Sequence, residues 1–238
     1  GVNGSPVTLI TADDQTDPTA GAEGMTKLTE VDGVAGVVGS FASSVSMAGA
    51  DVAARNEVMM ISPGSTSPLF TERAANGDFK GFWARTAPPD TYQAEALAQL
   101  ASDRGFKTVA TVAINNDYGI QFEQRFIEAF EKLGGTVVNA DNPTRYDPKA
   151  ATFTTEASAA FGEKPDAVAA ILYVESGALL LKAAYEPGLT EVVQVMLTVG
   201  VKTEECHTQV GREVDGKTII AGAIEAVPGG NGVVLAAL

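Results

Sequence analysis

The chain is poor in the residues from which many catalytic and metal sites are built. Its 238 residues include one cysteine, Cys206, and one histidine, His207. A single cysteine excludes an internal disulfide. With neither a second histidine nor a cysteine pair, no transition-metal site is expected. We interpret His207, in a polar stretch, as a bystander rather than a catalytic base.

Positive charge and long apolar runs are also scarce. Lys and Arg total 16 against 30 Asp and Glu, which gives a net charge of −14. Such a surface repels nucleic acid and anionic membranes, so neither is an expected partner, and its simplest role is solubility. The longest apolar run, residues 167–174, is too short to span a bilayer.

Three sequence signatures of α/β enzymes are missing. The chain has no G-x-S-x-G elbow, no P-loop and no G-x-G-x-x-G. Asp13 and Asp14 form a carboxylate pair, but adjacent residues of a strand point to opposite faces, so we interpret them as a solvated strand end. We therefore expect neither an enzyme nor a bound cofactor.

Strand-like and helical patterns alternate along the chain. This order predicts an α/β protein with parallel sheets covered on both faces. The expected helices are 17–30, 44–56, 91–104 and 122–133, and the expected strands are 7–12, 34–38, 58–61, 108–114, 136–140, 167–172 and 192–197. Asp17-Pro18 and Asp90 supply the expected starts of two helices.

Residues 82–89 interrupt this alternation. The segment is aromatic and ends in Pro88-Pro89, between two strand–helix arrays. We interpret it as a crossover between two lobes; the alternative is an ordinary loop.

Polar corners follow several of the expected strands, at 39–44, 115–119 and 173–176. A fourth polar segment, 61–68, leaves a strand without entering an obvious helix. Ligands of parallel α/β sheets bind at such carboxyl ends of strands. The sequence therefore favours a small polar ligand there.

The residue types in these corners suit a carboxylate. Ser43 and Ser44 open a helix, where hydroxyls and unpaired N–H groups attract anions. Ser65 and Thr66 add hydroxyls, and Gly64 lets a ligand approach the backbone. Tyrosines can stack on an apolar part and hydrogen-bond at the edge. The alternative is that the hydroxyls only cap helices and turns.

These stretches resemble a known family. Residues 9–18, 37–44, 60–68, 82–86 and 116–119 are similar in order and spacing to the type I periplasmic binding proteins, in the Leu/Ile/Val-binding branch. The Ile-Ser-Pro-Gly-x-Thr segment within 61–66 is the most specific.

The resemblance implies two Rossmann-like lobes with three crossovers and the ligand between them. Lobe 1, which anchors the ligand, would comprise residues 1–87 and 228–238, and lobe 2, which closes, residues 88–227. The implied function is capture of a small amino acid or related carboxylate for an ABC permease. The implied location is the periplasm or cell exterior, with or without a lipid anchor.

The same resemblance assigns the ligand-binding residues. Ser43, Gly64 and Thr66 match positions that hold the carboxylate and ammonium groups of an amino acid, with Ser65 as their neighbour. Tyr118 and Tyr173 match positions in the closing lobe.

The chain departs from the family pattern at the ammonium partner. The acidic residue expected after the strand ending near residue 197 is replaced by Val199. Glu175 or Asp117 substitutes for it, or the ligand has no free ammonium.

Both ends of the chain depart from the pattern as well. The chain begins at what resembles the family's second strand, and 232–238 resembles a helix that lies well beyond the 227–229 crossover. We therefore expect a fold incomplete at its N-terminus and near its C-terminus.

Two rival classes stay open. A ligand-sensing receptor would have the same fold and differ only in its partner domains. An α/β hydrolase or dehydrogenase would need a nucleophile–base pair or a phosphate loop, and neither is found in the sequence.

Overall fold

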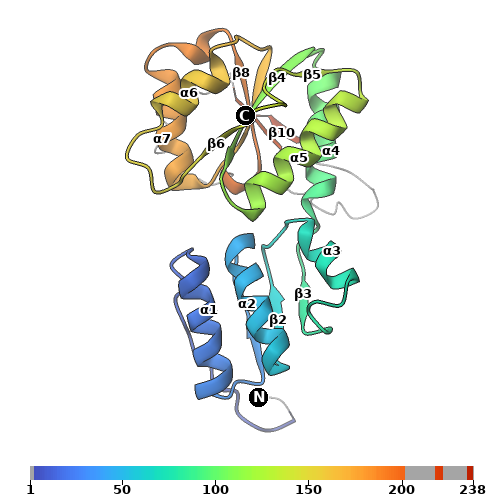
Figure 1. Cartoon of the computed structure of the whole chain (residues 1–238), viewed down its shortest axis with the longest axis vertical. Coiled ribbons are helices and arrows are strands. Elements are labelled where there is room, and N and C mark those ends of the chain that lie inside the picture. The colour runs from blue at the N-terminus through green and yellow to red at the C-terminus, as the bar shows by residue number, and fades with distance from the viewer. Residues whose placement is uncertain (1–2, 202–217, 222–234, 238) are drawn as a thin grey trace. The chain divides into compact units, whose positions relative to one another are not determined.

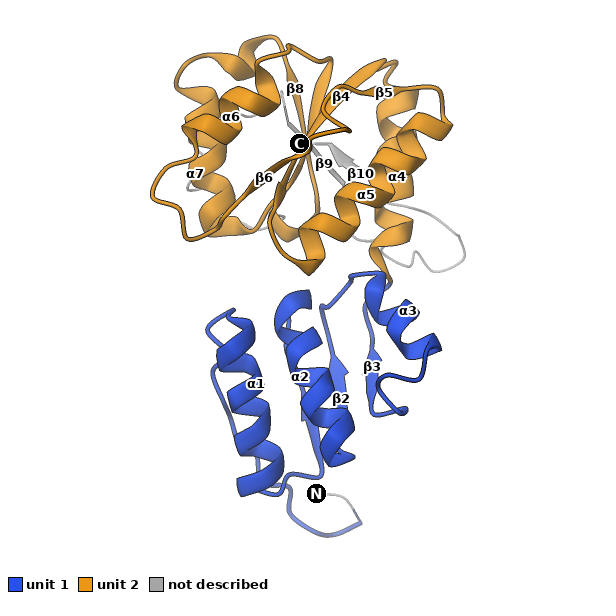
Figure 2. Ribbon diagram, viewed as in Figure 1, with its two compact units in different colours: residues 1–88 blue, residues 89–238 orange. Residues whose placement is uncertain are grey.

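The protein consists of two α/β units. The computed structural model describes residues 3–201, 218–221 and 235–237. Contacts within the chain divide it into Gly1–Pro88 and Pro89–Leu238 (Figure 2). Strands and helices alternate along both units (Figure 1), so the α/β class predicted from the sequence is confirmed.

The first unit is built on a parallel sheet in the order β1-β2-β3. Its strands are β1 (Gly36–Val38), β2 (Met59–Ser62) and β3 (Trp83–Arg85). The first half of the expected crossover at 82–89 is therefore a strand, because Trp83–Arg85 pair in register with residues 60–62 of β2. The two units meet in the sequence just beyond it.

The helices of this unit follow local signals in the sequence. They are α1 (Pro18–Thr26), which continues as the π-helical turn η1 (Lys27–Val31), α2 (Ser43–Asn56) and α3 (Leu69–Ala75). The Asp17 carboxylate accepts the Thr19 and Ala20 N–H groups at 2.9 and 3.2 Å, and so caps α1 as expected.

Helix α3 was not expected, because Pro68 indicates an interruption of regular structure. In the structure Pro68 lies directly before the helix, with a φ of −58° that suits a helix start. Phe70 of α3 then stacks on Trp83 with ring centroids 4.0 Å apart, and Phe79 packs beside them. Phe70 and Phe79 belong to the unit's hydrophobic core, and Trp83 packs against it.

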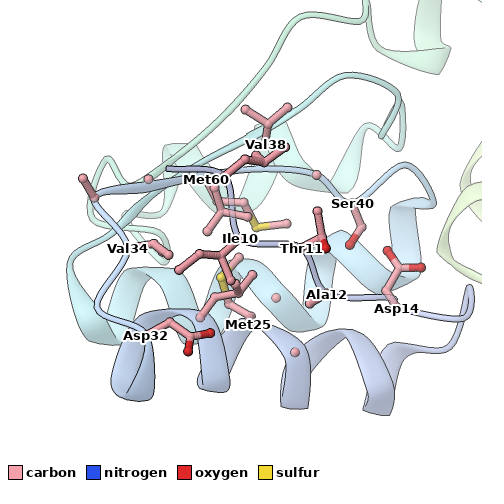
Figure 3. A pocket seen from close by; sticks show the side chains of 18 of the residues that line it. Ile10, Thr11, Ala12, Asp14, Met25, Asp32, Val34, Val38, Ser40 and Met60 are labelled. Atoms are coloured by element: carbon pink, nitrogen blue, oxygen red, sulfur yellow. The ribbon is translucent and has the colours of Figure 1, made fainter. Parts of the chain in front are cut away.

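The expected strand at 7–12 is not formed. Val7 and Leu9 are 70% and 85% exposed, and residues 6–14 form no strand. Residues 7–14 and 33–40 line opposite parts of a cavity of about 620 Å³ (Figure 3). Strand partners lie about 4.8 Å apart. A cavity of this size therefore separates the segment from the free edge of β1.

The second unit is a seven-stranded sheet in the order β10-β9-β8-β7-β4-β5, with β6 also paired to β4. Its strands are β4 (Thr108–Ile114), β5 (Thr136–Val137), β6 (Thr144–Tyr146), β7 (Ala167–Ile171), β8 (Gln194–Leu197), β9 (Thr218–Ala221) and β10 (Leu235–Ala237). All are parallel to their neighbours except β10, which is antiparallel to β9. Every residue of the central strand β7 is buried, as expected for a sheet covered on both faces.

Helices flank this sheet (Figure 1). α4 (Asp90–Asp103) packs on α5 (Asp117–Lys132), and α6 (Thr154–Phe161) packs on α7 (Val174–Tyr185), so the two pairs cover opposite faces. Two 3-10 turns, η2 (Leu189–Glu191) and η3 (Val199–Val201), flank β8. Asp90 was expected to cap α4 but is its first helical residue, where its charge suits the helix dipole.

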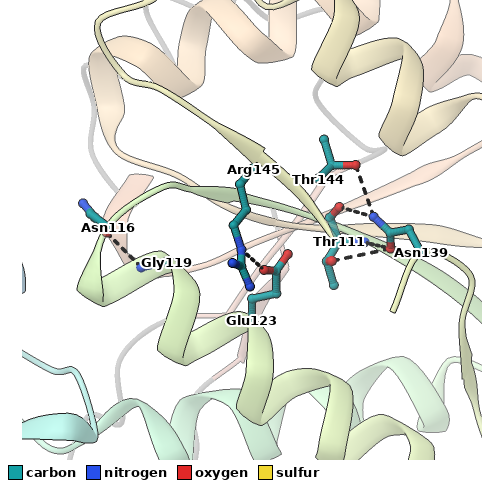
Figure 4. Close-up of polar contacts among 7 residues, drawn as sticks. All are labelled: Thr111, Asn116, Gly119, Glu123, Asn139, Thr144 and Arg145. Atoms are coloured by element: carbon teal, nitrogen blue, oxygen red, sulfur yellow. Dashed lines mark hydrogen bonds and ion pairs between the residues drawn. The ribbon is translucent and has the colours of Figure 1, made fainter. Parts of the chain in front are cut away.

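Strand β5 ends earlier than the expected 136–140 because a side chain takes over the pairing with β4. The Asn139 amide accepts the Thr111 N–H at 2.9 Å and donates to the Thr111 carbonyl at 2.8 Å (Figure 4). It also donates to Thr144 Oγ1 at 3.2 Å, in the next strand, β6. Asn139 thus bridges the gap between two short strands that share one neighbour.

The end of the chain differs from the expected helix at 232–238. Leu235–Ala237 form β10, and this strand covers the outer edge of β9. Cys206, His207 and the 227–229 crossover lie outside the described residues. Of residues 228–238 only Leu235–Ala237 are described, and they pair with β9 of the second unit. The assignment of 228–238 to the first lobe stays a prediction.

Candidate functional site

The hydroxyl-rich loops of the first unit lie next to each other at the carboxyl ends of strands β1 and β2. β1 and β2 are parallel neighbours, so the segments that follow them begin side by side. We call residues 39–44 and 62–67 together the anchor corner. It contains four of the six predicted ligand-binding residues, which are Ser43, Gly64, Ser65 and Thr66.

Buried serines hold the two loops of the anchor corner together. The Ser40 carbonyl accepts hydrogen bonds from Ser62 Oγ at 2.6 Å and Ser46 Oγ at 2.9 Å. Ser65 is fully buried, and its Oγ lies 2.7 Å from Ser46 Oγ and 3.1 Å from the Phe41 carbonyl that it donates to. The hydroxyl of Ser65, one of the predicted ligand-binding residues, thus already has hydrogen-bond partners within the first unit.

Ser43 and Gly64 also have clear structural roles. Ser43 is the first residue of α2, and its buried Oγ accepts the Ser67 N–H at 3.2 Å, which ties the helix start to the opposite loop. A Cβ on Gly64 would lie 2.5 Å from the Phe41 ring, so only glycine fits there without displacing that ring. Phe41 itself is 72% exposed.

Thr66 is half-buried and lies between two restrained neighbours. The carbonyls of Ser65 and Ser67 both accept hydrogen bonds from the guanidinium of Arg85. Sequence reasoning noted Arg85 only as part of the segment 82–89. Its contact with the 65–67 loop depends on the pairing of β3 with β2, which no local pattern reveals.

The two predicted tyrosines of the second unit lie together. Tyr118 and Tyr173 stack with centroids 5.4 Å apart and an interplanar angle of 10°. Tyr118 is buried, and its hydroxyl lies 2.7 Å from Thr198 Oγ1 after β8. Tyr173 is half-buried, after β7. Both tyrosines and Thr198 thus lie at carboxyl ends of parallel strands, as predicted for a binding site.

A third tyrosine, which sequence reasoning missed, supports this pair. Tyr146 is fully buried at the end of β6, and its hydroxyl accepts the Tyr173 N–H at 3.4 Å and lies 3.2 Å from Ser176 Oγ. Burial raises the pKa of Tyr146 to about 12 and also raises the pKa values of Tyr118 and Tyr173. All three phenols therefore stay neutral hydrogen-bonding groups near neutral pH.

The segment Asn116-Asp117-Tyr118-Gly119 caps and begins helix α5. Asn116 Oδ1 accepts the N–H group of Tyr118 at 3.1 Å and that of Gly119 at 2.9 Å, the second of which is drawn in Figure 4. A Cβ on Gly119 would lie 2.0 Å from the Ile114 carbonyl oxygen. The motif therefore turns the chain tightly from β4 into α5, and this turn places Tyr118.

The position expected to be acidic, Val199, and the acidic residues that could replace it differ in how far they are buried. Val199 is half-buried two residues after the end of β8, Asp117 is half-buried, and Glu175 is exposed. Asp90, which sequence reasoning treated only as a cap, is 2% exposed. Its charge contributes, after burial, to the raised pKa of Tyr118.

Other site types receive no support from the described part of the chain. Within it, no group of three or more His, Cys, Asp or Glu could hold a metal ion. No helix among the described residues has both the length and the apolar character needed to cross a membrane. The cavity of Figure 3 is lined by Met25, Leu28 and Met60 besides the two chain segments, and none of the six predicted ligand-binding residues lines it.

Each unit is an α/β unit built on a mainly parallel sheet, with polar groups at the carboxyl ends of its strands. Units of this kind are typical of type I periplasmic binding proteins. The chain belongs to the periplasmic binding protein family, whose model matches residues 1–229. The family predicted from the sequence is confirmed.

Relatives include both a binding protein and a receptor. The Leu/Ile/Val-binding protein homolog 2 of Brucella abortus is 44% identical over 80 residues, which are 34% of this chain and 21% of that protein. The human metabotropic glutamate receptor 8 is 28% identical over 112 residues, which are 47% of this chain and 12% of the receptor.

The fold also matches that of a solved relative. The leucine binding protein LivK of Thermotoga maritima has a TM-score of 0.80 at 27% identity, over 91% of this chain and 59% of that one. The chain thus spans about three-fifths of the length of this solved relative.

Proposed function

We propose that the chain is the ligand-capturing part of an ABC importer, located outside the cytoplasm and binding a small amino acid or related carboxylate. The ligand contacts the anchor corner first. The second unit then closes over it, and the closed form docks on a membrane permease. Closure of this kind is driven only by the ligand's differential affinity for the closed state.

The anchor corner is the observation that carries this proposal. Two strand ends and the start of the 14-residue helix α2 meet there, with hydroxyls and backbone N–H groups around Gly64. A helix start surrounded by hydroxyls is suited to a carboxylate. The relatives that bind leucine or branched-chain amino acids by name support the same ligand class.

Within this site we assign different roles to the predicted residues. Thr66 and Gly64 face the ligand, while Ser43 contributes from the start of α2. Ser65 holds the two loops of the corner together. In the second unit, half-buried Tyr173 covers the ligand and buried Tyr118 supports it from behind.

We predict that the second unit slows dissociation of the bound ligand and has little effect on the rate at which the ligand first binds. Tyr173→Ala should raise the dissociation rate by about tenfold and leave the association rate nearly unchanged, as most interface losses do. Tyr118→Phe, which keeps the stacked ring but loses the bond to Thr198, should have a smaller effect in the same direction. Stopped-flow measurements test this, and unchanged off-rates for both variants would remove the closing role.

We predict that Val199 shifts the ligand preference away from zwitterionic amino acids. A buried ammonium without a counter-charge is costly, and an apolar side chain occupies the position expected to be acidic. Calorimetry should therefore give tighter binding of 4-methylpentanoate than of L-leucine or L-valine. Tight L-leucine binding without binding of 4-methylpentanoate would show that another carboxylate, such as Asp90 or Asp117, serves the ammonium.

The sensor alternative rests on the similarity to the metabotropic glutamate receptor. A receptor would bind the same ligand class, so the panel above does not separate the two. Reconstitution with a candidate permease does: ligand-dependent stimulation of its ATPase activity supports the importer.

A further inference from the structure

Arg85 bridges the anchor corner and the last strand of the first unit. It is half-buried at the end of β3, and its Nη1 donates to the carbonyls of Ser67 at 2.9 Å and Ser65 at 3.3 Å. Its Nη2 donates to Thr71 Oγ1 at 2.6 Å. The two carbonyls belong to the residues on either side of Thr66.

The surroundings of Arg85 fix the direction of its guanidinium. The group lies 5.6 Å from the ring centroid of Trp83 and 6.0 Å from that of Phe70, and these two rings are stacked on each other. A planar guanidinium can donate along several directions at once, whereas an ammonium is a single flexible point charge. Arginine therefore suits this position better than lysine.

The backbone joins the same strand to the anchor corner at a second point. The Thr86 N–H donates to the Ser62 carbonyl at 3.1 Å and so continues the pairing of β3 with β2 by one residue. Residues 86–89 then lead into the second unit. Arg85 is thus held between the loop that carries Thr66 and the start of the connection between units.

We propose that Arg85 is a positioning residue for the ligand site. Its charge-assisted hydrogen bonds hold the peptides on both sides of Thr66, so that the Thr66 hydroxyl and N–H keep the direction needed to bind a carboxylate. Arg85 acts through Thr66 and does not itself touch the ligand. The inference rests on the function proposed above, and its test includes a measurement without ligand.

The binding test is a double-mutant cycle between Arg85 and Thr66. Calorimetry with L-leucine and 4-methylpentanoate is applied to Arg85→Met, Arg85→Lys, Thr66→Ala and the double variant. Arg85→Met should weaken binding by about tenfold, with partial recovery in Arg85→Lys. In the Thr66→Ala background the same change should have little further effect, because the group that it positions is gone. Additive losses would overturn the proposal.

Hydrogen exchange of the ligand-free protein gives the second measurement. The backbone amides of the non-proline residues in 62–68 should exchange about tenfold faster in Arg85→Met than in the wild type. Arg73→Met is the matched control, because Arg73 has comparable contacts in the same unit, to Asp51, Asp78 and the Phe79 ring, and should leave 62–68 unchanged.

The two measurements separate the inference from the proposed function. Unchanged exchange at 62–68 in Arg85→Met would overturn the role of Arg85, even if a probe binds. A wild-type chain that binds neither probe would instead count against the proposed ligand class, and exchange would still decide whether Arg85 orders the loop.

Discussion

Thr66→Ala and Ser43→Ala are each expected to weaken ligand binding by roughly ten- to a hundredfold while the protein stays folded. A hydrogen bond to a charged group contributes about 1.5–3 kcal/mol, and each variant removes one hydroxyl from the anchor corner. Thr66 should show the larger effect. It is half-buried, whereas Ser43 is 2% exposed.

The measurement is calorimetry with the probe that the wild type binds best among L-leucine, L-valine and 4-methylpentanoate, after a melting curve for each variant. Thr26→Ala is the control, because the Thr26 hydroxyl bonds only locally, to the Ala22 carbonyl at 2.8 Å in the same unit. Wild-type affinity in both folded site variants would mean that the hydroxyls serve only as caps and that the ligand binds elsewhere.

Gly119→Ala is expected to destabilise the second unit by about 3 kcal/mol or more, as severe overpacking does. The added Cβ would lie 2.0 Å from the Ile114 carbonyl oxygen, a backbone atom that moves only if the turn from β4 into α5 opens. Since Tyr118 lies on this turn, ligand binding should weaken together with stability.

The control for this change is a second helical glycine. Gly24 lies in α1, and a Cβ there would meet only Ala12 Cβ at 3.5 Å, an ordinary contact. Gly24→Ala should therefore be neutral or stabilise the protein by about 0.5–1 kcal/mol. Urea denaturation of both variants tests the pair; a Gly119→Ala variant as stable as the wild type would show that the turn can relax.

Elements with strong local signals could be predicted from the sequence. The strand expected at 108–114 is β4, and the helix expected at 44–56 is α2, which begins one residue earlier. Both a run of apolar residues and a helix of small residues are specified by neighbours along the chain. The cap at Asp17 was predictable for the same reason.

Elements that depend on a distant partner could not be predicted in this way. Residues 7–12 have a strand-like pattern, but a cavity separates them from β1, and no strand of the described part of the chain pairs with them. β5 is shortened because the Asn139 side chain takes over its pairing with β4. A strand needs hydrogen-bonding partners from elsewhere in the chain, and its own sequence does not specify them.

By itself the sequence determined the α/β class, the family, and the loops in which a ligand site was to be sought, because residue types and turn signals are local. The tertiary structure decided which side chains in those loops already have partners within their own unit. It buries Ser65 among hydroxyls, stacks buried Tyr118 on half-buried Tyr173, and brings Arg85 to the carbonyls on both sides of Thr66. These roles arise from the pairing of β3 with β2 and from the parallel order of β4, β7 and β8, which join residues far apart in the chain.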